Sequence, residues 1–417
     1  MEEPEPRIPW TTWYGLALLT AIHIFAQMDR IALAILLQPI KVELQLSDEQ
    51  LGILTGLAFA LFYATLGIPL ARYADRASRT RLLSACLVLW TAMTALSGFA
   101  RSFPQLFMAR VGVGVGEAGC LPASYSLISD MFPRSKRTLT IAIYQCGGTI
   151  GISVGTFVVG LLGYHFGWRA CLQFIGLAGL PLALLVFLTM REPPRPQTDE
   201  AGGEPARAVF RALSRRPAFV HMTLAYGIAG ITSYGIGQWN PTYLMRSFHL
   251  TMAQVGTWAG LATAAGSILG LMAGAVVATW LSRRDTRWEV WIPAIATLLT
   301  FPCAVFLALS PTIWMALTCK IAMAVCSSVS AGVAIAAVQA FVEPHRRATA
   351  VSVVIFLNSI LGLGLGPYII GLASDLFAPA FGQESLRYGI LVSTVFLPWA
   401  VVHYMIASKR SIADSVD

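Results

Sequence analysis

Apolar runs of about 20 residues recur along the whole chain, and they constrain its fold more than any other feature. A run of that length is what an α-helix needs to cross the hydrocarbon core of a bilayer. Hydrophobic residues make up 56% of the chain and charged residues 12%, roughly half the charged share of an average soluble domain. We delimit twelve such runs, at residues 13–38, 48–71, 82–101, 104–131, 138–162, 168–190, 218–244, 251–281, 289–309, 312–341, 347–374 and 386–408. The sequence therefore predicts an all-α polytopic membrane protein with twelve transmembrane helices.

Basic residues gather at the ends of these runs and indicate how the chain is oriented. If the N-terminus lies inside, 21 of the 29 Lys and Arg residues fall on the cytoplasmic side and five on the outer side. This bias follows the positive-inside rule, so we expect a multi-pass protein of the inner (plasma) membrane with both termini cytoplasmic. The net charge of +8 is spread over many segment ends, so nucleic acid is not an expected partner. We expect a monomer in the lipid bilayer.

The longest connection between runs, residues 191–217, separates six runs from six. Its first half is rich in proline, glycine and charge and predicts an extended linker. Its second half places Val209, Phe210 and Leu213 on one helical face, which predicts a short amphipathic helix on the inner leaflet. We therefore predict an N-terminal six-helix bundle at 1–190, a cytoplasmic linker at 191–217 and a C-terminal six-helix bundle at 218–417.

The two halves of the chain repeat one another. A pattern of leucine, hydroxyl, glutamine and glycine residues occurs twice at an offset of 204 residues: Leu46, Ser47, Gln50, Gly52 and Gly56, then Leu250, Thr251, Gln254, Gly256 and Gly260. Gly151 and Gly155 recur as Gly362 and Gly366. Glycines spaced four apart predict closely packed helices. A duplicated six-helix unit is typical of transporters whose two pseudo-symmetric bundles enclose a binding site near the midplane.

Three stretches carry a resemblance to a known family. After the second run, Asp75, Arg76, Arg79 and Arg81 resemble the signature of the major facilitator superfamily, with Ala71 and Ser78 in place of two glycines. In the fourth run, Arg110, Gly114, Gly116, Glu117 and Ala118 resemble a second motif of that superfamily. The pair Asp29–Arg30, the Gly116–Ala118 ending and residues 39–52 are similar to the spinster family.

The resemblance implies the major facilitator fold and alternating access. Animal spinster proteins export sphingosine-1-phosphate and lysophospholipids, so it also implies a lipid-like substrate. In the superfamily the connection after the second span acts as a gating latch. Carried over to this sequence, the latch consists of Asp75, Arg76 and Arg79, with Asp130 at the inner end of the fourth run as partner of either arginine.

Asp29 and Arg30 lie inside the first apolar run, where a charge costs from about 3 to more than 10 kcal/mol. Consecutive helical residues point about 100° apart, so these two cannot form an ideal pair with each other. Arg110 and Glu117 are seven residues apart in the fourth run and share a helical face. The superfamily fold places the first and fourth spans beside the central cavity. We therefore predict a cluster of Asp29, Arg110 and Glu117, with Arg30 and His23 nearby.

We interpret this cluster as a proton-coupling site, in which Asp29 carries the proton, Glu117 is coupled to it and Arg110 is the alternating partner. The alternative is a permanent ion network that holds the first span to the fourth. For an anionic head group the candidates are Arg30, Arg110 and Lys320, because such cations bind phosphate and carboxylate. Tyr234 and Asn358 are further substrate candidates, although polar residues at membrane depth are more often helix contacts, and Lys320 could snorkel to the surface.

These features predict a secondary transporter, proton-coupled, for an amphiphilic anionic substrate such as a lysolipid or a sphingolipid-like molecule. Small organic anions or hydrophobic drugs are the alternative substrates. A polytopic lipid-modifying enzyme is the alternative class, but the sequence has no phosphate-binding loop and no H-E-x-x-H motif. The G-x-S-x-G pattern at residues 151–155 lies inside an apolar run, where the strand-turn-helix context of a nucleophile is missing. We expect no enzymatic activity, no cofactor and no metal.

Overall fold

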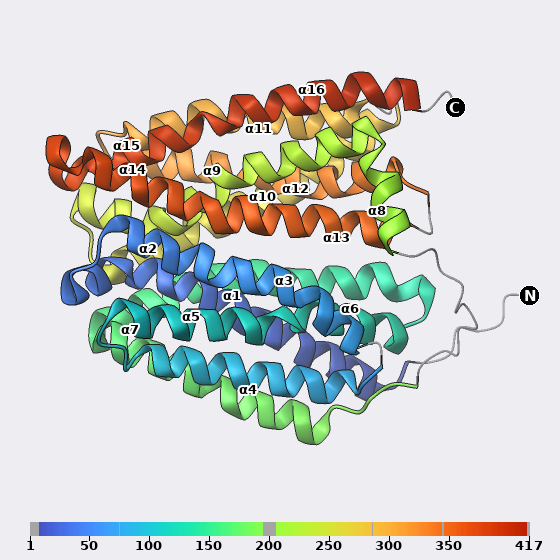
Figure 1. The fold of residues 1–417 in the computed structure, drawn as a ribbon, viewed down its shortest axis with the longest axis horizontal. Helices are drawn as coiled ribbons and strands as arrows, with labels where there is room; N and C mark the ends of the chain where they lie inside the picture. Colours follow the sequence, from blue (N-terminus) through green and yellow to red (C-terminus); the bar gives the residue numbers. More distant parts are fainter. Residues whose placement is uncertain (1–7, 75, 195–205, 286, 344–345, 415–417) are drawn as a thin grey trace, which may run out of the picture. The chain divides into compact units, whose positions relative to one another are not determined.

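The computed structural model describes residues 8–74, 76–194, 206–285, 287–343 and 346–414 (Figure 1). Within these ranges the regular structure is helical and contains no β-strand, which confirms the all-α prediction. The chain forms two compact units. Unit 1 comprises residues 1–33 and 62–199, and unit 2 comprises residues 34–61 and 200–417. Residues 34–61, which the sequence analysis placed with the N-terminal bundle, thus pack with the C-terminal part of the chain.

Unit 1 is built from long helices that turn at glycines. It contains the first part of α1 (Trp10–Leu44), most of α3 (Leu57–Ala74), α4 (Arg79–Ser97), α5 (Phe103–Ala118), α6 (Cys120–Met131) and α7 (Arg134–Thr189). Helices α5 and α6 form one span interrupted at Gly119. Helix α7 holds two spans that meet at Gly167, whose φ of +78° favours glycine. The turn between the fifth and sixth spans is therefore very short.

Unit 2 holds the remaining helices. They are the end of α1, α2 (Asp48–Thr55), the start of α3, α8 (Ala206–Ser214), α9 (Pro217–Phe248), α10 (Met252–Ser282), α11 (Trp288–Ala308), α12 (Ile313–Ala340), α13 (Arg347–Asn358), α14 (Gly366–Phe381), α15 (Ser385–Thr394) and α16 (Phe396–Asp414). A π-helical stretch, η2 (Ser359–Leu365), joins α13 to α14, and a 3₁₀ turn, η3 (Gly382–Glu384), precedes α15.

The described helices account for the twelve predicted spans. Within the described ranges, nine stretches are long and apolar enough to cross a membrane. Two of these nine, Ser135–Thr189 and Thr349–Arg410, each contain two of the predicted spans. Helix α9, of 32 residues, supplies the seventh. The chain is therefore a multi-pass membrane protein, as the apolar runs predict.

Glycines hold the closest helix contacts, as their spacing predicts. In unit 1, a Cβ at Gly151 would lie 2.5 Å from the backbone oxygen of Ile24 in α1. In unit 2, a Cβ at Gly52 of α2 would lie 2.6 Å from the backbone oxygen of Pro367 in α14. Both distances are too short for a side chain, so each glycine allows two helix backbones to touch.

The repeat in sequence is also a repeat in local structure. Ser47 begins α2 by accepting the backbone N–H of Gln50, whose side chain accepts the N–H of Ser47 in return. Thr251 and Gln254 form the same capping box at the start of α10. Such a box satisfies backbone donors that a helix start otherwise leaves open. The second and eighth spans therefore begin in the same way for the same physical reason.

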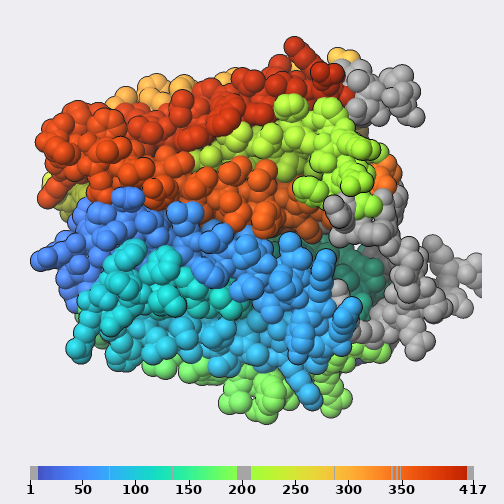
Figure 2. All heavy atoms as spheres, viewed as in Figure 1, coloured from blue at the N-terminus to red at the C-terminus, as the bar shows by residue number. Residues whose placement is uncertain are grey.

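The predicted amphipathic helix exists, but its apolar face lies elsewhere than expected. Helix α8 contacts α9 and α13 of unit 2. In Figure 2 the yellow-green atoms of α8 and α9 border the orange atoms of unit 2. Val209 and Leu213 are buried in a core that includes Phe219 and Met222, while Phe210 is exposed. The prediction that this face lies on the inner leaflet was therefore wrong for Val209 and Leu213. Burying them against protein removes the same apolar area from water.

Candidate functional site

Asp29 lies in α1 of unit 1 and binds two neighbouring helices. Its Oδ2 is 3.3 Å from Nη1 of Arg110 in α5, and its Oδ1 accepts a hydrogen bond of 2.5 Å from the Thr94 hydroxyl in α4. Asp29 and Arg110 are each 2% exposed. A buried carboxylate needs this many partners because an isolated charge at membrane depth is very costly. The expected proximity of Asp29 and Arg110 is thus present.

Arg30, the next residue of α1, points to a different partner. Its Nη2 is 2.6 Å and its Nε 2.7 Å from Oε2 of Glu117, so both nitrogens bind one carboxylate oxygen. The guanidinium also lies 4.7 Å from the centre of the Tyr63 ring in α3, a cation–π contact. The sequence analysis expected Arg30 only near the cluster, whereas the structure makes it the direct partner of Glu117.

Together these contacts form two adjacent ion pairs between α1 and α5. The pairs are Asp29 with Arg110 and Arg30 with Glu117. In the first pair α1 supplies the acid and α5 the arginine. In the second pair α1 supplies the arginine and α5 the acid, so each helix carries one charge of each sign. Removing one partner of a buried pair usually costs about 3–5 kcal/mol. Each of these four charges is therefore strongly held by its partner across the α1–α5 contact.

Three further residues of unit 1 surround these pairs. His23 stacks on Tyr144, with ring centroids 4.7 Å apart, and Tyr144 meets Tyr125 edge to face.

Sequence reasoning missed Thr94 and Tyr63, because a threonine or tyrosine in an apolar span is usually a helix contact. Both lie in spans of the same bundle as the charged first span. That position alone does not distinguish them from the other polar residues of those spans.

The substrate candidates lie in both units. In unit 1, the Arg30 side chain is 24% exposed and that of Arg110 3%. In unit 2, Tyr234 of α9 is 40% exposed, whereas Asn358 is buried with its Oδ1 against Gly230. Asn358 also directly precedes the π-helix η2, and π-helical turns are frequent at functional sites. The structure thus leaves Tyr234 more accessible than Asn358.

Lys320 of α12 is the most unusual of these candidates. It lies in the apolar interior of unit 2 and keeps part of its surface accessible. Among the described residues it has no hydrogen-bond or ion-pair partner. An ammonium group in such a place is uncompensated, which is costly unless a ligand or water supplies the missing partner.

At the other end of unit 1, Arg79 joins the start of α4 to two acids. It forms an ion pair with Asp130 of α6 and another, of 2.7 Å, with Glu192. Of the two arginines proposed as partners of Asp130, the structure selects Arg79, while Arg76 is exposed. Asp75 lies outside the described residues. Glu192 was missed, because it follows the sixth span in a segment that looked like plain linker.

Glu192 is held as a carboxylate. Burial raises its pKa, but the backbone N–H of Thr80 and the Arg79 guanidinium outweigh burial, so the pKa lies below its usual range. The Ser78 hydroxyl donates a third contact, of 3.1 Å. The segment after α7 is therefore tied to the start of α4 by charge.

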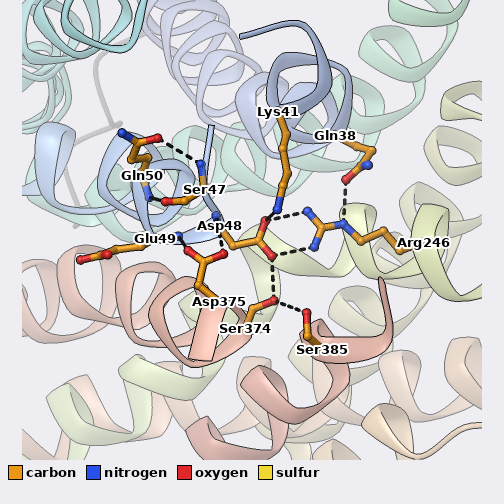
Figure 3. Close-up of polar contacts among 10 residues, drawn as sticks. All are labelled: Gln38, Lys41, Ser47, Asp48, Glu49, Gln50, Arg246, Ser374, Asp375 and Ser385. Atoms are coloured by element: carbon orange, nitrogen blue, oxygen red, sulfur yellow. Dashed lines mark hydrogen bonds and ion pairs between the residues drawn. The ribbon is translucent and has the colours of Figure 1, made fainter. Parts of the chain in front are cut away.

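In unit 2, Asp48 at the start of α2 is the centre of a second buried network (Figure 3). Arg246 of α9 binds it with two parallel contacts of 2.7 Å, the bidentate geometry that arginine and carboxylate favour. Lys41 lies 2.6 Å from Oδ1, and the Ser374 hydroxyl of α14 donates to Oδ2 at 2.7 Å. Gln38 accepts from Nε of Arg246. This network fixes the α1–α2 turn to α9 and α14.

Sequence reasoning missed this network. It counted Lys41 and Arg246 among the basic residues of the outer side, and Asp48 among the residues that resemble the spinster family. A signal was available, because these two are among the five basic residues on the expected outer side, where arginine and lysine are disfavoured. In the described ranges, no three His, Cys, Asp or Glu side chains are placed to hold a metal ion.

Comparison with known proteins places the chain in a family. The sequence profile of the Major Facilitator Superfamily matches residues 19–367. An MFS-type efflux pump of Mycolicibacterium smegmatis is 30% identical over 420 residues, which cover 98% of this chain and 95% of the pump. The sphingosine-1-phosphate transporter SPNS2 of Danio rerio is 25% identical over 399 residues, covering 90% of this chain and 79% of SPNS2.

A crystal structure supports the same assignment. A bacterial homologue of the human lysosomal transporter spinster, in an inward-facing and unoccupied conformation, matches with a TM-score of 0.88 and 30% identity over 99% of both chains. These relatives are transporters and not enzymes, in agreement with the prediction for this chain. The chain belongs to the Major Facilitator Superfamily and, within it, to the spinster family of transporters.

Proposed function

We propose that this transporter moves an amphiphilic anionic substrate across the inner (plasma) membrane by alternating access, coupled to protons, with both termini in the cytoplasm. The observation that carries the proposal is the double ion pair between α1 and α5. Asp29 and Glu117 are buried carboxylates, each held by an arginine of the other helix. Because both pairs lie at the same α1–α5 contact, a conformational change that moves Arg110 from Asp29 toward Glu117 would leave no arginine unpaired.

Proton coupling follows from what the arginines do to the two acids. A carboxylate next to arginine stays ionised, whereas a buried carboxyl group that loses its arginine favours the protonated form. If movement of α1 transfers Arg110 from Asp29 to Glu117, Asp29 is left without an arginine and binds a proton. The reverse movement releases it. Asp29 is the carrier in this proposal, and Glu117 is coupled to it.

Lys320 supports an anionic substrate. Its ammonium has no partner within the described residues, so a phosphate or carboxylate would compensate it. The exposed part of Arg30 offers a second cationic group. SPNS2, a relative, carries sphingosine-1-phosphate, an amphiphile with a phosphate head. Small organic anions and hydrophobic drugs are the second candidate substrates, and one relative, of Mycolicibacterium smegmatis, is an efflux pump.

The Asp48 network supports alternating access. It joins residues 38–48 to α9 and α14 at the end expected to face outward. Such a network can close one side of the path to the substrate, since Arg246 has its carboxylate partner only while these segments are together. We propose that Asp48, Arg246 and Lys41 form the outer gate. Arg79, Asp130 and Glu192 then form the inner latch, together with Asp75 and Arg76.

Proton flux in proteoliposomes tests the proposal. The purified protein is reconstituted with a pH-sensitive dye inside, and lysolipids, sphingosine-1-phosphate and simple organic anions are added in turn. We expect substrate-dependent proton movement in the wild type and none in Asp29→Asn or Glu117→Gln. Asp285→Asn is the matched control, because Asp285 is an exposed acid near the end of α10. Normal proton-linked transport by both Asp29→Asn and Glu117→Gln would contradict the proposal.

A further inference from the structure

Asp375 of α14 makes a contact that the ion pairs of the outer gate do not include. Its Oδ1 accepts the backbone N–H of Asp48 at 3.0 Å, and its Oδ2 accepts the backbone N–H of Glu49 at 2.7 Å (Figure 3). These are the first two residues of α2, whose N–H groups have no acceptor within their own helix. The side chain of the N-terminal cap, Ser47, accepts the N–H of Gln50. Asp375 therefore supplies the missing acceptors from another helix.

This contact binds backbone, whereas the Asp48 ion pair binds side chains. Arg246 connects α2 to α9, and Asp375 connects α2 to α14. The seam below the contact is tight, because a Cβ at Gly371 would meet the backbone oxygen of Asp48. Tyr368 lies about one turn before Gly371 in α14, and its hydroxyl donates to Glu49 at 3.2 Å. The start of α2 is thus held to α14 by groups that do not depend on Arg246.

Chemistry makes an ionised carboxylate the right group for this position. The first turn of a helix carries a positive partial charge that favours an anion. Two oxygens match two neighbouring N–H groups, and each hydrogen bond is strengthened by the charge. An amide at this place would offer one oxygen to one N–H and set its own NH₂ donor against the other. When the helices part, water at the membrane surface can take over both N–H groups, so the contact is reversible.

We propose that Asp375 is a positioning residue of the transport cycle: its carboxylate holds the start of α2 on α14 in the outward-closed state and releases it on opening. The inference rests on the proposed alternating access. It predicts that the balance between closed and open outer ends depends on the charge and shape of residue 375 as well as on the Asp48–Arg246 pair.

Distance measurements between spin labels test this role in the full-length protein. In a variant whose seven native cysteines are replaced, Phe99→Cys and Leu309→Cys carry the labels. Both positions are exposed at the expected outer ends of α4 and α11. We expect Asp375→Asn to shift the ratio of closed to open populations toward open by about tenfold, the effect of losing one charge-assisted hydrogen bond. Asp375→Glu keeps the charge and should shift it less.

The matched control is Glu384→Gln. Glu384 is an acid of the same end that pairs with Arg387 and accepts from Ser247. We expect its distance distribution to equal that of the wild type. An unchanged distribution in Asp375→Asn, or an equal shift in both variants, would overturn the inference. The measurement needs no substrate, so a failure of proton-linked transport in the wild type would refute the proposed function separately. Thermal unfolding in detergent verifies that each variant is folded.

Discussion

Arg79 is a buried arginine at the start of α4 that joins two distant segments of unit 1. It is buried and binds two carboxylates at once, Asp130 and Glu192, while its Nη1 also donates to Ser126. Two acids around one arginine leave an excess of negative charge, which the hydroxyl and backbone donors around Glu192 offset. The two carboxylates around Arg79 carry one more negative charge than the arginine neutralises. The pairing therefore holds α6 and the segment after α7 to the start of α4.

Replacing Glu192 by glutamine should lower stability in a pH-dependent way. Because the pKa of Glu192 is below its usual range in the folded protein, its ionised form stabilises the fold. That contribution is fully present above the unfolded-chain value of about 4.3 and is lost as the pH falls through the lower folded value. We expect Glu192→Gln to cost about 1 kcal/mol at pH 7 and nothing in strong acid. Thermal unfolding from pH 3 to 7 measures it.

The control for this prediction is Asp285→Asn. Asp285 pairs with Arg287 at 3.8 Å, and both side chains are about half exposed. Its removal should change stability little at any pH, because exposed pairs are screened by water. A difference between wild type and Glu192→Gln that stays constant down to pH 3 would show that the carboxylate charge is not what matters.

At this scale, sequence reasoning finds charges but not always their partners. Asp29, Arg110 and Glu117 stand out because a charge in an apolar span is so costly. Which arginine binds which acid depends on side-chain directions and on helix offsets of a few ångströms, and no spacing rule fixes these. Thr94 and Glu192 look ordinary in sequence. They matter because folding brings them beside a charge from a distant segment.

Helix ends show the internal repeat more clearly than the sequence does. In unit 1, Arg169 donates to the backbone oxygens of Gly98 and Ala100 just after α4. In unit 2, Arg387 donates in the same way to Ala308 and Ser310 at the end of α11. Each arginine satisfies carbonyls that a helix end leaves open. The acceptors are 210 residues apart and the arginines 218, so the changed spacing hid this pair from the repeat analysis.

Some helix boundaries depend on residues close in sequence, and others depend on contacts with distant segments. The capping boxes of α2 and α10 could be predicted, because they depend on residues three apart. The break of the second span at Gly56 could not, because it depends on Gly364 of η2, whose backbone oxygen occupies the place of a Cβ. Helix α8 is a similar case. Its apolar face was predictable from sequence, but the surface that covers it was not.

Gly371→Ala should separate α2 from α14. The added methyl would meet the backbone oxygen of Asp48 and lie 3.0 Å from the Trp239 ring. Backbone cannot move aside as a flexible side chain does, so α2 must shift. We expect a loss of about 1–3 kcal/mol in thermal stability. The spin-label pair at residues 99 and 309 should also report a larger open population.

Gly332→Ala is the matched control for this prediction. Gly332 lies in α12, and a Cβ there would have no neighbour within 4 Å. Alanine should be neutral there or stabilise the helix by up to about 1 kcal/mol. If Gly371→Ala behaved like Gly332→Ala, the tight seam between α2 and α14 would not be needed for closure.

At the scale of the whole molecule, the duplicated architecture carries unequal chemistry. The paired charges of α1 and α5 lie in unit 1, whereas α9 and α12 contain no acidic residue along their full length. At the repeat offsets, Asp29 corresponds to Ser233 and Glu117 to Ser327. Unit 2 instead places a lone lysine in α12 and the Asp48 network at its end. This asymmetry argues for a division of labour, with proton exchange in unit 1 and anion binding in unit 2.

Lys320→Gln tests that division, and the result should differ in kind from that of Asp29→Asn. An ammonium without a partner destabilises the fold, so its removal should raise the unfolding temperature. It should also raise KM for an anionic substrate about tenfold, the cost of one charged hydrogen bond, while protons moved per substrate stay unchanged. Lys320→Arg should restore affinity in part, and Lys409→Gln, at an exposed position near the end of α16, should change nothing.

Asp29→Asn should abolish proton movement and leave substrate binding intact. If both substitutions reduced binding and proton movement in parallel, the two units would not divide these tasks.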